Sequence, residues 1–175
     1  MIYRRPTQQE HERANVSSFV SWFNRVYRTD YKVDSEPNPP EAVLRSSCGS
    51  TCWVEVSSAF LNEDYAKDRY SFATPGEAHK PYRNRPLQEP DNNFAQRFVC
   101  VVKKKLEKQS YIPYKNKYGG GYLVVPIMNP LFNEQTFQAM KAAWATFAPT
   151  VNDLGCFSSV YILSASNDPI EFLPL

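Results

Sequence analysis

The sequence predicts one α/β domain spanning residues 1–175, in which helices flank a mixed central β-sheet. The first observation behind this prediction is size and composition. A chain of 175 residues, 42% of them hydrophobic, can build a core without disulfides or structural metals. The second is that helical and strand patterns alternate along the chain. The third is their order: helix, three strands, helix, strand, helix, strand. An opening meander favours antiparallel pairing, whereas the later strand–helix–strand steps favour parallel pairing with right-handed crossovers.

The first helix is predicted at residues 8–28. The motif TQQE before it is typical of a capping box, with Thr7 as the N-cap and Glu10 at the third helical position. Glu12 has no role in this cap. It lies four residues before Val16, so it extends the apolar stripe of the helix toward the N-terminus. That stripe comprises Val16, Phe19, Val20, Phe23, Val26 and Tyr27.

Three strands are predicted next, at residues 29–36, 41–45 and 51–58. The segment PNPP separates the first two, and the turn SSCGS joins the second to the third. The third strand, TCWVEVSS, is rich in the β-branched and aromatic residues that are typical of buried strands.

Residues 60–93 show no regular period and contain four prolines. We predict a long irregular insertion here, with a short helical piece at NEDYAKDRY. Long loops inside compact domains are often lids or binding loops. The remaining predicted elements are a helix at 94–112, a strand at 119–127, a helix at 133–147 capped by Asn133, and a strand at 156–164.

Composition and charge narrow the partners and the compartment. The formal net charge of +2 does not by itself require nucleic acid. No apolar run is long enough to span a bilayer, and no apolar segment follows the N-terminal arginines, so we expect a cytoplasmic protein without a membrane partner.

His11 has no partner motif and is expected to be exposed. The cysteines do not form a set of zinc ligands, and we expect them to be reduced structural thiols. They are Cys48, Cys52, Cys100 and Cys156.

A carboxylate in the middle of the third strand needs a partner. Glu55 lies between Val54 and Val56, and a buried carboxylate is costly unless it is paired or binds a metal. Glu41 begins the preceding strand. If these two strands are hairpin neighbours, their carboxylates converge at one end of the sheet, where hard oxygen ligands suit Mg²⁺ or Mn²⁺. Such an ion lowers the pKa of a bound water and stabilises charge on a phosphodiester in transit.

The proline–acid pair at 40–41, followed by an acid in a hydrophobic strand, resembles the PD-(D/E)xK nuclease superfamily, which has the restriction-endonuclease-like fold. The α-β-β-β-α-β core of that superfamily matches the predicted order over about residues 8–127. The resemblance implies that Glu41 and Glu55 are the metal-binding acids. It also implies that Glu12 matches the extra acid that many members place on the first helix.

The lysine of the superfamily motif is missing from its usual place. The resemblance expects it two residues after the second acid, where this chain has Ser57. Some members supply the lysine from the following helix. Lys105, one turn past Val101, is our first choice for such a migrated lysine. On this interpretation Glu41, Glu55 and Lys105 form the catalytic set, with Mg²⁺ or Mn²⁺ as cofactor.

A basic segment covers the end of the same predicted helix and the residues after it. Residues 103–117 hold six lysines and one acid, Glu107, which gives a local charge of +5 among interleaved tyrosines. Basic and aromatic surfaces of this kind bind nucleic-acid backbones, although an ordinary solvated surface is the alternative. Lys105 and Lys108 are expected to share a helix face. The predicted nucleic-acid-binding residues are Lys103, Lys104, Lys108, Lys115 and Lys117.

Three functions fit these observations. The first is a metal-dependent nuclease acting on DNA or RNA. The second is a catalytically inactive nuclease-like module that binds nucleic acid or protein, which the displaced lysine favours. The third is a structural subunit that forms a homodimer through the Tyr-rich loop.

Purely structural roles are also open for the three acids. Glu55 can be an exposed strand residue, with its two valine neighbours facing the core. Glu41 can be a solvated strand start, and Glu12 can be a first-turn charge that complements the helix dipole.

Overall fold

The computed structural model describes residues 6–82, 88–147, 154–164 and 168–172. It confirms the α/β class: a mixed sheet of seven strands lies between helices. The strands run in the order β1-β2-β3-β5-β6-β7, with β4 paired to β5 beside this path. The pairs β1–β2, β2–β3 and β6–β7 are antiparallel, whereas β3–β5, β4–β5 and β5–β6 are parallel. Their bounds are β1 Lys32–Ser35, β2 Ala42–Arg45, β3 Thr51–Val56, β4 Ala59–Phe60, β5 Gly121–Met128, β6 Phe157–Leu163 and β7 Ile170–Glu171.

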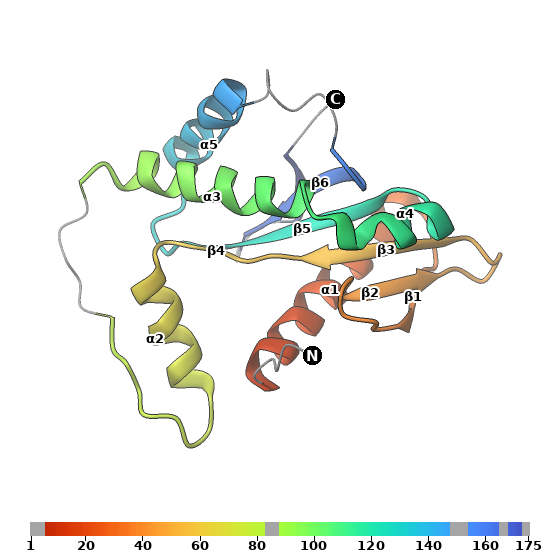
Figure 1. The fold of residues 1–175 in the computed structure, drawn as a ribbon, viewed down its shortest axis with the longest axis horizontal. Helices are drawn as coiled ribbons and strands as arrows, with labels where there is room; N and C mark the ends of the chain where they lie inside the picture. The colour runs from red at the N-terminus through yellow and green to blue at the C-terminus, as the bar shows by residue number, and fades with distance from the viewer. Residues whose placement is uncertain (1–5, 83–87, 148–153, 165–167, 173–175) are drawn as a thin grey trace.

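Helices cover both faces of this sheet (Figure 1). Helix α1 (Pro6–Tyr27) packs on one face, against inward residues such as Val54 and Val124. Four residues of the predicted apolar stripe make this contact, whereas its last two are exposed: the four are Val16, Phe19, Val20 and Phe23, and the two are Val26 and Tyr27. Helices α3 (Pro90–Leu106), α4 (Ile112–Tyr118) and α5 (Glu134–Phe147) lie on the other face. The sheet therefore separates two apolar clusters. Strand β3 contributes Trp53 to the α3 side and Val54 to the α1 side, as strand alternation requires.

The capping box predicted for α1 is wrong. The helix begins at Pro6, so Thr7 already lies inside it. Proline suits a first helical turn because its missing N–H would be unpaired there anyway. The Thr7 hydroxyl donates instead to the carbonyl oxygen of Ala73, at 3.2 Å. Thr7 therefore joins α1 to the end of the next helix along the chain, α2 (Glu63–Ala73), rather than capping its own helix.

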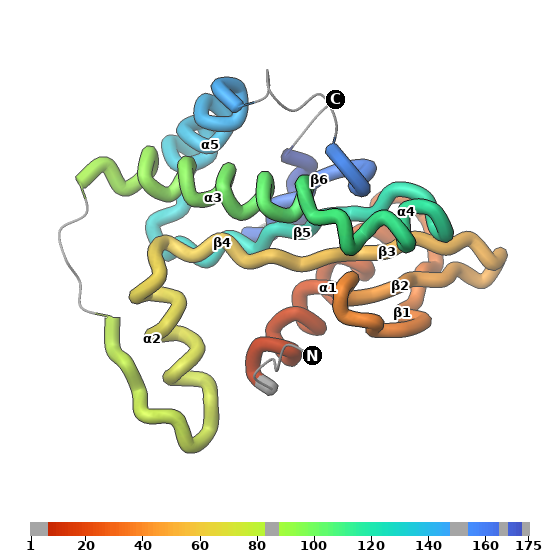
Figure 2. Tube along the Cα trace, viewed as in Figure 1, coloured from red at the N-terminus to blue at the C-terminus, as the bar shows by residue number. Residues whose placement is uncertain are grey.

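In its described residues, 60–82 and 88–93, the segment predicted as an irregular insertion holds more regular structure than expected. It contains the end of β4, the start of α3, and helix α2 (Glu63–Ala73), which covers the predicted helical piece after its first residue. Asn62 caps α2, since its Oδ1 accepts from the backbone N–H of Tyr65 at 2.8 Å. Only Ser71 of α2 is buried, so this helix carries no apolar stripe that a sequence pattern would reveal. Figure 2 shows α2 and the following chain projecting from the body.

The helix predicted at 94–112 stops at Leu106, and a second helix begins at Ile112. Helix α3 ends at Leu106, Lys108 has an extended backbone with ψ 114°, and a 3-10 turn (η1, Gln109–Tyr111) leads into α4. Pro113 occupies the first turn of α4, a favourable position for proline. Lys108 therefore does not share a helix face with Lys105, which corrects that prediction.

The last helix agrees with its prediction. Asn133 caps α5 by accepting from the backbone N–H of Thr136 at 3.1 Å, as predicted. In the described residues, no helix combines the length and apolar character needed to cross a membrane.

Candidate functional site

Glu55 lies at the centre of the sheet and is fully buried, with 0% of its surface exposed. Strand β3 runs between β2 and β5, so both of its edges are paired. Alternation puts Glu55 on the same face as Trp53, toward α3, while Val54 and Val56 pack under α1. The interpretation of Glu55 as an exposed strand residue is therefore wrong.

Lys105 is the residue that meets Glu55. From the last turn of α3, its Nζ donates to Glu55 Oε1 at 2.5 Å. The Lys105 side chain is 19% exposed, so the pair is largely removed from water. The other carboxylate oxygen, Oε2, is buried and has no hydrogen-bond partner in the described part of the chain. A buried ion pair is stabilising only when its remaining polar atoms are also satisfied. Glu55 thus retains one unused acceptor inside the protein.

Glu41 lies at the same end of the β2–β3 pair as Glu55. Strands β2 and β3 pair Ala42 with Val54 and Val43 with Trp53. Glu41 is the residue just before β2, and Glu55 is the residue that follows Val54 in β3. Glu41 is buried, with 8% of its surface exposed, so it is not a solvated strand start.

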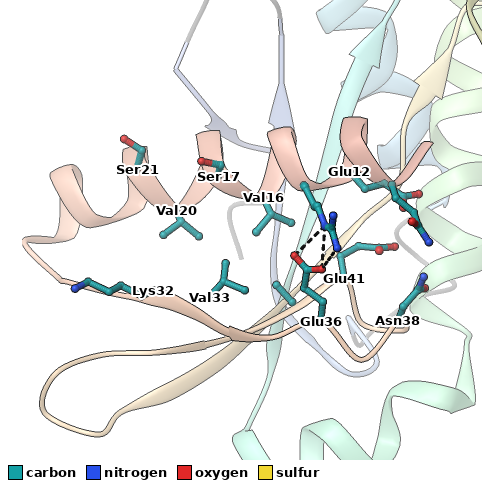
Figure 3. Close-up of a pocket in the computed structure, with 13 residues that line it drawn as sticks. Glu12, Val16, Ser17, Val20, Ser21, Lys32, Val33, Glu36, Asn38 and Glu41 are labelled. Carbon is teal, nitrogen blue, oxygen red and sulfur yellow. Dashed lines mark hydrogen bonds and ion pairs between the residues drawn. The ribbon is translucent and has the colours of Figure 1, made fainter. Parts of the chain in front are cut away.

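Glu12 reaches the same region from α1. Glu12 and Glu41 both line a pocket of about 480 Å³ between α1 and the first two strands. In Figure 3 their side chains lie at the same end of this pocket, away from Val20 and Lys32. Glu12 is buried and accepts a hydrogen bond from Gln8 Nε2 at 2.9 Å. The first turn of α1 has no acidic residue, so Glu12 is not the first-turn dipole charge considered above.

Two of the three acids share a pocket: Glu12 and Glu41 line it on the α1 side of the sheet, whereas Glu55 contacts Lys105 on the α3 side. Among the described residues, no group of three or more Asp, Glu, His or Cys side chains is arranged as a ready-made metal site. The donors that the chain offers are carboxylate oxygens, which are hard ligands suited to Mg²⁺ or Mn²⁺.

The predicted nucleic-acid-binding lysines are exposed at the end of α3, in the link after it and on α4. Three of them lie over aromatic rings: Lys103 over Phe147 at 4.8 Å, Lys108 over Tyr111 at 5.2 Å, and Lys117 over Tyr118 at 4.8 Å. Lys115 donates to the carbonyl oxygen of Gly155 at 2.7 Å, and Lys104 is also exposed. The lysines therefore form a basic and aromatic surface on the α3 side of the sheet, outside the Glu55–Lys105 contact.

Sequence reasoning missed a histidine beside the site. His11 is only half-buried rather than exposed, and its Nε2 lies 3.3 Å from the Ser58 hydroxyl. Burial lowers the pKa of His11; the nearby Glu12 opposes this shift, and Arg69 adds to it. The contact links α1 to the chain just beyond β3. No sequence motif signals it, because it depends on how α1 crosses the sheet.

No protein-family model, curated protein or experimentally determined structure matches this chain.

Proposed function

We propose that this protein is a metal-dependent nuclease of the PD-(D/E)xK type, with Lys105 in the role of the motif lysine. The observation that carries the proposal is the contact between Lys105 Nζ and Glu55 Oε1. The Lys105 ammonium group, on α3, reaches Glu55, which stands at the second acid of the motif. Ser57 stands at the position where the superfamily usually has its lysine. The order of α1, β1, β2, β3, α3 and β5 supports the same assignment, with β4, α2 and α4 as additions.

The proposed metal ligands are Glu41 and Glu55, with Glu12 assisting. Mg²⁺ commonly binds one or two carboxylates and completes its shell with water and substrate phosphate, so a preassembled cage is not required. The unpartnered Oε2 of Glu55 is a ligand atom that the fold leaves unused. When bound, the ion would supply Lewis-acid stabilisation of the phosphodiester and a more acidic water.

The side chains have separate tasks in this proposal. Lys105 fixes the orientation of the Glu55 carboxylate and offers an ammonium group that can stabilise negative charge on a phosphate oxygen. Glu41 and Glu12 place two further carboxylates where the pocket meets the end of β2. The lysines of α3 and α4 hold the nucleic-acid backbone by charge. A cytoplasmic location and homodimer formation through residues 60–93 stay predictions.

One observation favours a second function. In the same ion pair, Lys105 already neutralises the carboxylate that a metal would share. A chain in which Glu55 binds only this lysine would be a catalytically inactive module, which binds nucleic acid or protein through the basic and aromatic surface. The two functions differ in one property: whether Glu55 binds a cation in addition to its lysine.

Calorimetric titration with Mn²⁺ and Mg²⁺ separates them. The protein is titrated alone and with a phosphorothioate oligonucleotide, because substrate phosphates can complete the site. Glu55→Gln keeps the side-chain shape and removes the charge, and Glu134→Gln is the matched control at an exposed glutamate on α5. We expect metal binding and cleavage in the wild type and in Glu134→Gln, and neither in Glu55→Gln. Oligonucleotide binding without metal binding or cleavage would establish the inactive module instead.

A further inference from the structure

A second pocket lies between α1 and the carboxyl ends of β5 and β6, and we call it the serine pocket. It is about 710 Å³, within the size range of pockets that hold small organic ligands. Its lining comes from α1, from residues 126–128 of β5, and from Leu163 and Ser164 at the end of β6. Its described lining includes neither Lys105 nor any of the three acids proposed to bind metal, so an inference about it does not rest on the nuclease function.

One side of the serine pocket is made of hydroxyl groups. Helix α1 brings three exposed serines to it, Ser17, Ser18 and Ser21. Ser164 is the fourth, and its Oγ is buried without a hydrogen-bond partner in the described part of the chain. A buried hydroxyl without a partner is costly. Because Ser164 lines the pocket, rotation about its single side-chain bond can bring this hydroxyl to a ligand there.

The other side of the serine pocket is apolar. Trp22 of α1 is half-buried, and both Trp22 and Leu163 pack against the apolar cluster under α1. Pro126 and Met128 also line the pocket, and strand alternation puts them on the same face of β5 as Val124, a member of that cluster. An indole ring offers a flat apolar surface together with one N–H donor. The pocket therefore joins an apolar wall to a wall of groups that both donate and accept hydrogen bonds.

The charges at the serine pocket are already paired. Of its described lining residues, only Arg25 and Asp168 are charged. Arg25 Nη2 donates to both carboxylate oxygens of Asp168, each at 2.7 Å. An ionic ligand would have to break this pair or enter without a counter-charge, which is unfavourable. A purely apolar ligand would leave the serine hydroxyls without partners. The lining therefore favours a neutral ligand with one hydroxylated edge and one apolar face.

We propose that the serine pocket binds a neutral saccharide. A sugar ring carries hydroxyl groups along its edge and C–H groups on its faces, so it has the same division as the pocket. Its hydroxyls pair with Ser18 and Ser164, and a C–H face lies against Trp22 and Leu163. The volume of the pocket leaves room for more than a single ring, so a disaccharide is the smallest ligand that we test.

The first test titrates the wild-type protein with neutral disaccharides by calorimetry. The probes are maltose, cellobiose, lactose, mannobiose and diacetylchitobiose, each added up to about 50 mM, far above a Kd of about 1 mM. We expect at least one of them to bind with a stoichiometry of one to one. Inorganic phosphate and glucuronate are the charged probes, and neither should displace the bound sugar. If no neutral disaccharide binds, or if only the charged probes bind, the proposal is overturned.

The second test removes the hydroxyl that lacks a partner. Ser164→Ala should weaken binding of the best disaccharide about two- to tenfold, which is the value of one neutral hydrogen bond. The urea midpoint should stay the same or rise, because the variant removes a buried polar atom that has no partner in the described residues. Ser110→Ala, at an exposed serine outside the pocket lining, is the control and should change neither quantity. A lower urea midpoint with unchanged sugar affinity would give Ser164 a structural role and overturn the proposal.

The third test fills the pocket from α1. Ser18 lines the serine pocket but not the pocket that holds Glu12, and Ala14 is exposed one helical turn earlier and lines neither. We expect Ser18→Trp to abolish disaccharide binding and Ala14→Trp to keep the affinity within about twofold of the wild type. Thermal unfolding of both variants checks that they fold. Sugar binding by a folded Ser18→Trp variant that equals the wild type would overturn the proposal. Neither substitution should change Mn²⁺ binding or cleavage, so this inference and the nuclease proposal stand or fall separately.

Discussion

One ion pair lies in the candidate site and another lies beside it, and their shortest N···O distances are nearly the same. Lys105 meets Glu55 at 2.5 Å, and Arg13 meets Glu36 at 2.6 Å. Each pair connects a helix to a strand or to the chain beside one. Their surroundings differ: the side chains of the first pair are 19% and 0% exposed, and those of the second are 63% and 39% exposed. Burial, and not distance, therefore decides what each pair means for stability and function.

The difference follows from what remains after one partner is lost. Water solvates Glu36 at once if Arg13 leaves, so the pair contributes little. Glu55 has no such access, and its second oxygen already lacks a partner among the described residues. A buried charge pair that folding does not favour by itself is the kind of feature that a functional requirement would retain. This contrast can be measured.

Lys105→Met should have the largest effect on stability. It keeps the length of the side chain but leaves the Glu55 carboxylate buried without its cation. The free energy of unfolding should fall by about 3–5 kcal/mol, measured by urea denaturation. Lys104→Met, at the exposed neighbouring position, is the control and should change it by about 0.5 kcal/mol or less. A loss below about 1 kcal/mol in Lys105→Met would mean that water or another group reaches Glu55 easily.

Removing both charges should restore much of that loss. In the double variant Lys105→Met with Glu55→Leu, no unpaired charge is left, and apolar replacements of buried pairs are often neutral or stabilising by about 1–4 kcal/mol. A double-mutant cycle gives the coupling energy of the pair. We expect a stable double variant that has lost Mn²⁺ binding and cleavage. Should the double variant instead be as unstable as the single one, the pair would be a structural necessity rather than a functional one.

Arg13→Gln should have a much smaller effect, because the pair with Glu36 is exposed. We expect a loss of about 0.2–1 kcal/mol at low salt. Raising NaCl to about 1 M should abolish most of this loss, since the Debye length falls to about 3 Å, whereas the effect of Lys105→Met should persist. Urea midpoints for both variants at the two salt concentrations give the comparison. Equal salt sensitivity would remove the distinction drawn between the two pairs.

The sequence predicted the buried pair better than the exposed one, for physical reasons. Strand alternation and helical periodicity identify Glu55 and Lys105, because each lies next to apolar residues whose burial sets its direction. The pocket pair depends on how β1 docks against α1, and neither Arg13 nor Glu36 has an apolar neighbour that reveals this. Sequence reasoning therefore reached two acids of the pocket, Glu12 and Glu41, but not Glu36. It predicted a short helical piece where α2 lies but not the extent of this helix, in which only Ser71 is buried.

The smallest predicted effect concerns His11, which is half-buried. Burial lowers its pKa, so the folded state binds a proton less readily than the unfolded chain, whose ordinary value is 6.5. The unfolded state then carries more protons in the window just below 6.5, and stability must rise with pH through that window and fall as the solution is acidified. His11→Gln removes this dependence. The urea midpoint of the wild type, relative to His11→Gln, should therefore decrease from pH 7.5 to pH 5.5. A flat difference would show that the contact with Ser58 leaves His11 as free to ionise as in the unfolded chain, and that the α1 end of the site is as solvated as the Arg13–Glu36 pair.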